Sequence, residues 1–183
     1  NHQRVEYDAL VLMSSNGISD VPRPLAISSD DRLTWLQHIE GERPESLGSA
    51  DLEQILEFFT QLEIVGRQAP DFNYHAAEAG IDLRNVVANL ENRYQRLVES
   101  CSDDRVSSGE NGPRNNMSSL LSSEIQPALD LIKRRLNKSP IARRLDAAYW
   151  RLSPSDFGSH NFLREYRSNK LAFLDFEYFG WDD

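Results

Sequence analysis

The chain has 183 residues, with 39% hydrophobic and 27% charged residues, which is typical of a soluble globular protein of about one domain. Its net charge of −9 argues against nucleic acid as a partner, because phosphate binding depends on clustered Lys and Arg. The apolar runs are too short to span a bilayer and no leader opens the chain, so we expect a cytoplasmic protein with no membrane partner. An acidic surface suits a cationic substrate, but more often it only keeps a cytosolic protein in solution.

The first forty residues predict a helix, an extended segment and a strand. Apolar residues recur among polar ones over residues 3–15, which predicts a helix of about three turns that Asn16-Gly17 ends. The prolines within residues 21–25 favour an extended backbone, since each disfavours a helical conformation in the residue before it. Residues 33–39 then predict a strand, which Glu40-Gly41 closes.

Helical patterns follow from Ser49 onward, where Ser49 or Asp51 can serve as the helix cap. A second helix is predicted over residues 82–99. The apolar stripes of these two helices, which we expect to be buried, are Leu52, Ile55, Leu56, Phe59 and Leu62 in the first and Leu83, Val86, Val87, Leu90, Tyr94, Leu97 and Val98 in the second.

Residues 102–118 are rich in Ser, Asn, Asp and Gly, which predicts a surface loop that is either a linker or a functional flap. Ser123 is then expected to open a third helix, with Gln126 completing a capping box and Pro127 in the first turn. A fourth helix is predicted from Ser139-Pro140 to Trp150.

Two segments near the end contain the candidate chemistry. Asp156 and Asn161 are five residues apart in a turn-rich stretch, and Asp175 ends a short apolar run that predicts a buried strand. Phosphoryl transfer needs one carboxylate to orient the acceptor hydroxyl and accept its proton. It also needs an amide oxygen and a second carboxylate to hold magnesium. The spacing predicts Asp156 in the first role, as the catalytic residue, and Asn161 and Asp175 as the metal ligands.

At these residues the chain resembles the aminoglycoside phosphotransferase and choline kinase family, whose loop reads His-Gly-Asp-x-x-x-x-Asn before a strand that ends in Asp. Pro154 stands where the family has His, and Ser155 where it often has Gly. The resemblance implies an α+β, protein-kinase-like fold. Residues 1–40 would be a remnant of the N-terminal β lobe, with a helix, a strand and the hinge, and residues 41–183 the mostly helical C-terminal lobe.

The same resemblance implies an ATP-dependent kinase that uses Mg²⁺ and moves the γ-phosphoryl group to a hydroxyl of a small molecule, such as an aminoglycoside, choline or a sugar. The order of elements further implies that Glu6 pairs with a phosphate-binding lysine and that the backbone of Gln37, His38 and Ile39 meets adenine. Each has a plain alternative, because the helix dipole favours Glu in a first turn and a strand with Trp35 and Ile39 on one face is ordinary core.

In this family a glycine-rich loop and a strand lysine precede the Glu-bearing helix. We therefore expect these 183 residues to be part of a longer protein and to transfer little phosphate by themselves. A pseudokinase-like module that holds a nucleotide or partner without transfer also fits the Pro154-Ser155 departure. A hydrolase with Asp156 and Asp175 on a metal is a third reading. The sequence identifies neither the acceptor nor the oligomeric state.

Overall fold

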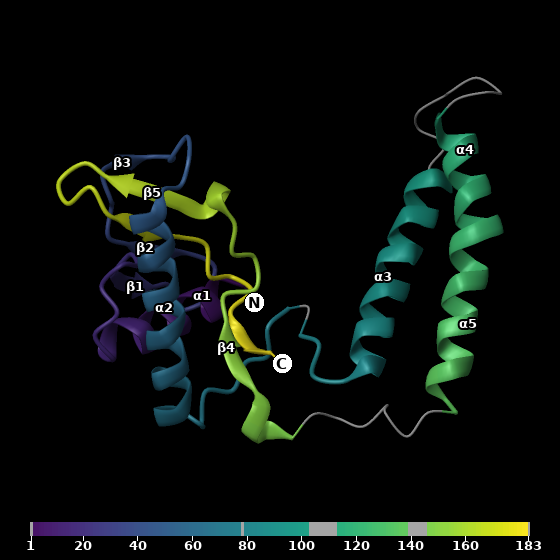
Figure 1. The fold of residues 1–183 in the computed structure, drawn as a ribbon, viewed down its shortest axis with the longest axis horizontal. Coiled ribbons are helices and arrows are strands. Elements are labelled where there is room, and N and C mark those ends of the chain that lie inside the picture. Colours follow the sequence, from purple (N-terminus) through teal and green to yellow (C-terminus); the bar gives the residue numbers. More distant parts are fainter. Residues whose placement is uncertain (1, 78, 103–112, 139–145, 183) are drawn as a thin grey trace. The chain divides into compact units, whose positions relative to one another are not determined.

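The structure is a computed structural model that describes residues 2–77, 79–102, 113–138 and 146–182 (Figure 1). It contains helices and short antiparallel strands, so the fold class is α+β. The chain divides into two compact units: unit 1 comprises Asn1–Ala79 and Ala148–Asp183, and unit 2 comprises Gly80–Ala147. Every predicted site residue belongs to unit 1. The predicted lobe boundary at residue 40 also falls within unit 1.

Helix α1 (His2–Ser15) opens unit 1, as the sequence predicts. It buries Ala9, Leu10 and Met13 completely in the core of the unit. The helix ends at Asn16-Gly17, where Gly17 has a φ of +84° that residues with a side chain rarely adopt. The side chain of Asn16 donates a hydrogen bond to the carbonyl of Leu12 and satisfies one of the last helical acceptors.

The described residues of unit 1 also form three small antiparallel sheets. Strand β1 (Pro24–Ile27) pairs with β2 (Thr34–Leu36), and β4 (Arg151–Ser153) pairs with β7 (Gly180–Asp182). The third sheet has the order β3-β5-β6, formed by Gly41–Glu42, Phe162–Glu165 and Leu171–Phe173. The strand predicted over residues 33–39 is thus shorter, and Trp35, which the alternative reading put in the core, is 50% exposed.

Helix α2 (Ser49–Gln68) is present as predicted, but the face that it buries matches the predicted stripe only in part. Leu62 from that stripe is buried, whereas Leu52 and Leu56 are exposed. Phe58 and Val65, which the stripe did not include, are buried as well. The capping prediction also needs correction. Gly48 is the N-cap residue, and its backbone N–H donates to the Asp51 carboxylate at 2.8 Å, so Asp51 acts from the third helical position and Ser49 is not the cap.

Asp51 also joins α2 to β5. Its carboxylate accepts two parallel hydrogen bonds from the Arg164 guanidinium, from Nη1 at 3.0 Å and from Nη2 at 2.9 Å. The Arg164 hydrogen bonds lower the pKa of Asp51, and the bond from the Gly48 amide adds to this effect. The pair fixes the start of α2 against β5 of the third sheet.

An aromatic cluster fills the core where α2 meets the third sheet. Phe58 packs against Phe173 at 4.6 Å between ring centroids and stacks on Phe157 at 5.5 Å. Phe162 and Phe176 extend the same cluster, and both are almost completely buried. Phe157 comes from the predicted catalytic loop, so this loop is anchored in the core of unit 1.

Unit 2 is built from helices. Helix α3 (Leu83–Ser102) begins after Asp82, whose side chain accepts from the backbone amides of Arg84 and Asn85. Of the stripe predicted for this helix, only Val87 is buried, at 8% exposure, so the expectation of a broad buried face is wrong. Glu91 forms a salt bridge with Lys133, which ties α3 to α5.

The third predicted helix begins earlier than expected. Helix α4 (Pro113–Leu120) runs through a π-helical turn, η1 (Leu121–Ile125), into α5 (Gln126–Leu136), so residues 113–118 are helical and Ser123 caps no helix. Pro127 explains the π turn, because a proline inside a helix lacks an N–H and its ring clashes with the carbonyl four residues earlier. Residues 103–112 of the predicted loop lie outside the described residues.

The fourth predicted helix falls mostly outside the described residues as well. Its described end forms only a 3₁₀ turn, η2 (Ala147–Tyr149). None of the described helices combines the length and the apolar character that crossing a bilayer requires.

Candidate functional site

A cavity of about 290 Å³ in unit 1 brings together residues that are far apart in the sequence. Five of the predicted site residues line it: Glu6 from α1, Gln37, His38 and Ile39 after β2, and Asp175 after β6. The rest of the lining is Leu10, Pro22, Leu36, Leu163, Leu174 and Phe176. The size is close to the lower end of ligand pockets, roughly 300–1,000 Å³, and suits a group as large as a nucleobase.

Glu6 is half-buried on the side of α1 that faces this cavity. Burial raises the pKa of its carboxyl, and the nearby negative charges of Asp175 and Glu177 raise it further, while a hydrogen bond from the Phe176 backbone opposes the shift. No cationic side chain in the described residues forms a salt bridge with Glu6. Its carboxylate is therefore placed where a positive group would be stabilised.

The segment Gln37 to Ile39 follows β2 and turns its backbone along the cavity. The Gln37 N–H is used, because it donates to the carbonyl of Arg23 at 2.9 Å. No hydrogen bond in the described part of the chain involves the backbone of His38 or Ile39. Leu36, Leu163 and Leu174 supply apolar walls beside this backbone.

The Asp156 loop begins where β4 ends and is sharply turned. Ser155 has a φ of +68°, and the Asp156 amide donates to the carbonyl of Pro154 at 2.9 Å, which closes a three-residue γ-turn. Glycine adopts a positive φ without the steric cost that a Cβ brings. Asp156 itself is exposed at the end of the turn.

Asn161 is held next to Asp156 by its own side chain. The amide Nδ2 donates to the carbonyl of Asp156 at 3.0 Å, and the residue is only 9% exposed. This bond fixes the orientation of the amide and leaves Oδ1 as an acceptor. The backbone carbonyl of Asn161 accepts from Leu174 at 2.9 Å, which places Asn161 beside the segment that contains Asp175.

Asp175 lies two residues beyond β6 rather than at its last position, and its φ of +66° is unusual for a residue with a side chain. Desolvation raises the pKa of its carboxyl, and the charges of Glu177 and Asp156 raise it further. A hydrogen bond from the Glu177 amide and the nearby His160 side chain lower the pKa of Asp175 instead. The pairing of Phe162 with Phe173 in β5 and β6 brings the Asp156 loop and Asp175 together.

His160 lies beside Asp156, but the sequence analysis did not predict it as a site residue. Its Nε2 lies 3.3 Å from a carboxylate oxygen of Asp156, and both side chains are exposed. The spacing of four residues across a turn was the available signal. Leu163 and Leu174 were missed as well, although each lies next to a predicted functional segment and alternates with a core phenylalanine.

The two predicted metal ligands fit magnesium by the chemistry of their donors. Mg²⁺ prefers oxygen ligands and is commonly bound by one or two protein groups together with phosphate oxygens and water. Asn161 Oδ1 and the Asp175 carboxylate form such a pair. Within the described residues, no group of three or more His, Cys, Asp or Glu side chains is arranged to hold a metal without further ligands.

Comparison with known proteins finds no match: neither a protein-family model nor a curated protein sequence matches the chain.

Proposed function

We propose that this chain contains the nucleotide and metal site of an ATP-dependent phosphotransferase that acts on a hydroxyl of a small molecule. The observation that carries the proposal is the 290 Å³ cavity, in which Glu6 and the segment Gln37 to Ile39 meet Asp175, although Asp175 is more than a hundred residues away from both in the sequence. These positions were assigned to one nucleotide site from the sequence. An accidental resemblance gives no reason for them to share a cavity.

The arrangement supports a division of roles. The apolar walls and the backbone of His38 and Ile39 suit adenine, which puts the phosphates toward Glu6 and Asp175. The chemistry that bound magnesium would supply is neutralisation of the negative charge that develops during transfer. Asn161 and Asp175 would hold the ion. The proposed fold relationship is to protein-kinase-like enzymes, in which these roles occur in the same chain order.

Asp156 would orient the acceptor hydroxyl and accept its proton. Neither Asp156 nor Asn161 lines the cavity, but the Asp156 charge is close enough to raise the pKa of Asp175, and its carboxylate is exposed, so an acceptor can approach from solvent. Catalysis in this class depends on positioning and charge neutralisation. The γ-turn at Ser155 and the anchoring of Phe157 in the aromatic cluster are the features that position it.

The second candidate, a module that binds nucleotide without transfer, is favoured by one observation. Pro154 and Ser155 stand where the kinase family that the loop resembles has His and often Gly. The two candidate functions give Asp156 different roles, but both use the cavity for nucleotide binding. Both therefore predict nucleotide binding, and only the first predicts turnover.

Calorimetric titration of Mg-ATP tests the shared part. We expect Asp175→Asn to weaken binding at least tenfold and Asp182→Asn, the matched control beyond Gly180, to change it less than twofold. A larger loss from Asp182→Asn would mean that the metal ligand is misplaced. An ADP-release screen with aminoglycosides, amino alcohols and sugars then separates the candidates. Acceptor-dependent release that Asp156→Ala abolishes supports transfer and excludes the binding module. Because these 183 residues are expected to transfer little phosphate by themselves, even slow release of this kind decides between the two.

A further inference from the structure

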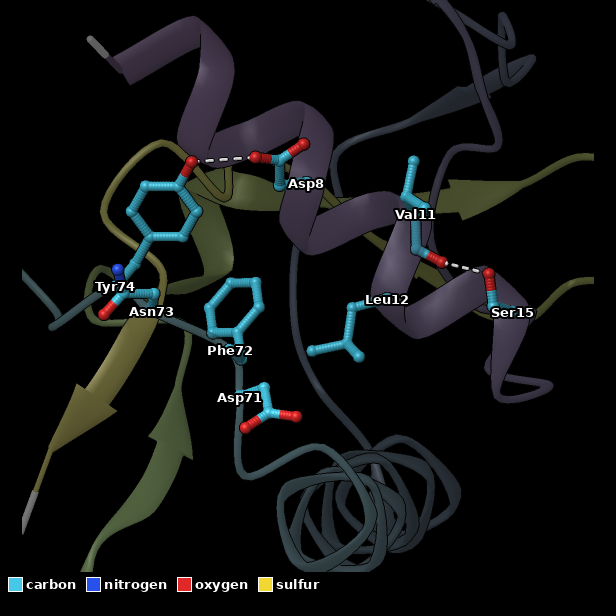
Figure 2. A pocket seen from close by; sticks show the side chains of 8 residues that line it. All are labelled: Asp8, Val11, Leu12, Ser15, Asp71, Phe72, Asn73 and Tyr74. Atoms are coloured by element: carbon cyan, nitrogen blue, oxygen red, sulfur yellow. Dashed lines mark hydrogen bonds between the residues drawn. The ribbon is translucent and has the colours of Figure 1, made fainter.

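A second cavity lies on another side of α1. It is an open depression of about 530 Å³ between α1 and the segment that follows α2. The side chains that line it are drawn in Figure 2: Asp8, Val11, Leu12 and Ser15 from α1, and Asp71, Phe72, Asn73 and Tyr74 from the segment. It has no lining residue in common with the proposed nucleotide site.

Its two carboxylates are not equivalent. Asp8 is already compensated, because its Oδ2 accepts from Arg4 Nε at 2.9 Å and from the Tyr74 hydroxyl at 2.7 Å. Asp71 has neither a salt bridge nor a side-chain hydrogen bond to any residue that the structure describes. The cavity therefore presents one uncompensated negative charge.

The walls beside Asp71 are apolar and firmly held. Figure 2 shows Leu12 on the α1 side of the cavity and Phe72 on the other side, with Asp71 next to Phe72. The Phe72 ring contacts Tyr74 and the buried Phe179 edge to face. Its backbone carbonyl accepts from Trp181 Nε1 at 2.6 Å. The wall is therefore formed before any ligand arrives, which lowers the ordering penalty of binding.

We infer that this cavity binds a small organic monocation that has an apolar body, such as an arylalkyl or alkyl ammonium ion. The ammonium group would pair with Asp71, and the apolar body would lie between Leu12 and Phe72. The aromatic face of Phe72 adds attraction for a cation. A single positive charge fits because Arg4 already compensates Asp8. Nucleotides and other anions are disfavoured by the same charge.

A titration followed by amide NMR shifts tests the inference, with phenethylammonium as the probe and 2-phenylethanol as its neutral counterpart. We expect the cation to shift amides of residues 8–15 and 71–74, and to bind at least five times more tightly than the alcohol. Its affinity should fall with added salt. These readouts do not depend on nucleotide binding, so they can fail while the proposed function holds, or the reverse.

Asp71→Asn should weaken binding of the cation at least fivefold. It should leave the alcohol unaffected, since Asp71 is exposed and its replacement disturbs no internal bond. Glu53→Gln is the matched control, because it removes one negative charge from an exposed position on α2. Three results would overturn the inference: equal affinity for the alcohol, an unchanged affinity in Asp71→Asn, or an equal loss in Glu53→Gln.

Discussion

The Glu6 carboxylate accepts a hydrogen bond from the backbone amide of Phe176, the residue that follows Asp175. Helix α1 therefore holds the proposed metal-binding segment directly. This bond also confines Glu6 near the charge of Asp175. The two carboxyls disfavour each other's ionised form, which suits a site that waits for a cation.

Glu6→Gln should stabilise the protein at pH 7 in the absence of nucleotide and metal, because the glutamine keeps an acceptor for Phe176 without the charge. The pKa of Glu6 is raised above its ordinary value of 4.5. The folded state therefore binds this proton more tightly than the unfolded chain. Its contribution is most favourable below the unfolded value and is lost as pH rises through the folded one. Urea denaturation should show the gain at pH 7 and almost none at pH 4. A gain that is equal at both pH values would contradict the electrostatic explanation.

Asp51→Asn should instead destabilise the protein at pH 7. The Arg164 hydrogen bonds lower the pKa of Asp51 from its ordinary value of 3.8, so its stabilising contribution is present above that value and is lost as pH falls through the lowered one. We expect a lower denaturation midpoint than wild type at pH 7 and a smaller difference at pH 3. Arg164→Lys is the control, since it keeps the charge but loses the two parallel bonds, and it should retain only part of the stability. A pH-independent loss in Asp51→Asn would refute the assignment.

Ser155→Gly should stabilise the protein by about 0.5–1 kcal/mol. A left-handed conformation is unfavourable by roughly 1–2 kcal/mol for a residue with a Cβ, and the greater freedom of glycine in the unfolded chain offsets part of the gain. Ser155→Ala keeps the Cβ and should give no gain, which makes it the matched control in chemical denaturation. If both variants shifted the midpoint equally, loss of the hydroxyl and not the backbone would be responsible.

Gly180→Ala should destabilise the protein by at least about 2 kcal/mol, in the range of overpacked core positions. A Cβ at this position would lie 2.4 Å from the carbonyl carbon of His75 and 2.5 Å from the Ala76 nitrogen, and backbone atoms cannot move aside as a side chain can. At Gly48 the nearest atom is 3.8 Å away, so Gly48→Ala should be several times milder. Thermal unfolding of the two variants compares them directly, and equal losses would mean that β7 can shift.

Local sequence signals predicted several of the elements of unit 1. The helix of residues 3–15 and its stop at Gly17 depend on periodicity and on one glycine, and both are properties of neighbouring residues. Their order in the chain predicted one shared site for Glu6, Gln37 to Ile39, and Asp175. These residues line one cavity. Their roles in nucleotide binding stay predictions.

The failures have a common cause, which is that packing partners are not encoded locally. In α2 the predicted stripe included Leu52 and Leu56, which are exposed, and omitted Phe58, which is as apolar as they are and is buried. The aromatic cluster around Phe173 decides which of them is buried. The capping signal at Ser123 failed similarly, because the helix continues through the proline by means of a π turn. His160 was overlooked because its contact with Asp156 depends on the fold of the turn.

Helix α1 is a shared wall, with Glu6 and Leu10 on one cavity and Asp8 and Leu12 on the other. A rigid helix cannot reshape one cavity without moving a wall of the second. Any effect of an organic cation on Mg-ATP affinity must then be reciprocal: the factor by which one ligand changes the affinity of the other is the same in both directions. The fold thus makes α1 the element through which a small amine and a nucleotide would become cooperative or antagonistic.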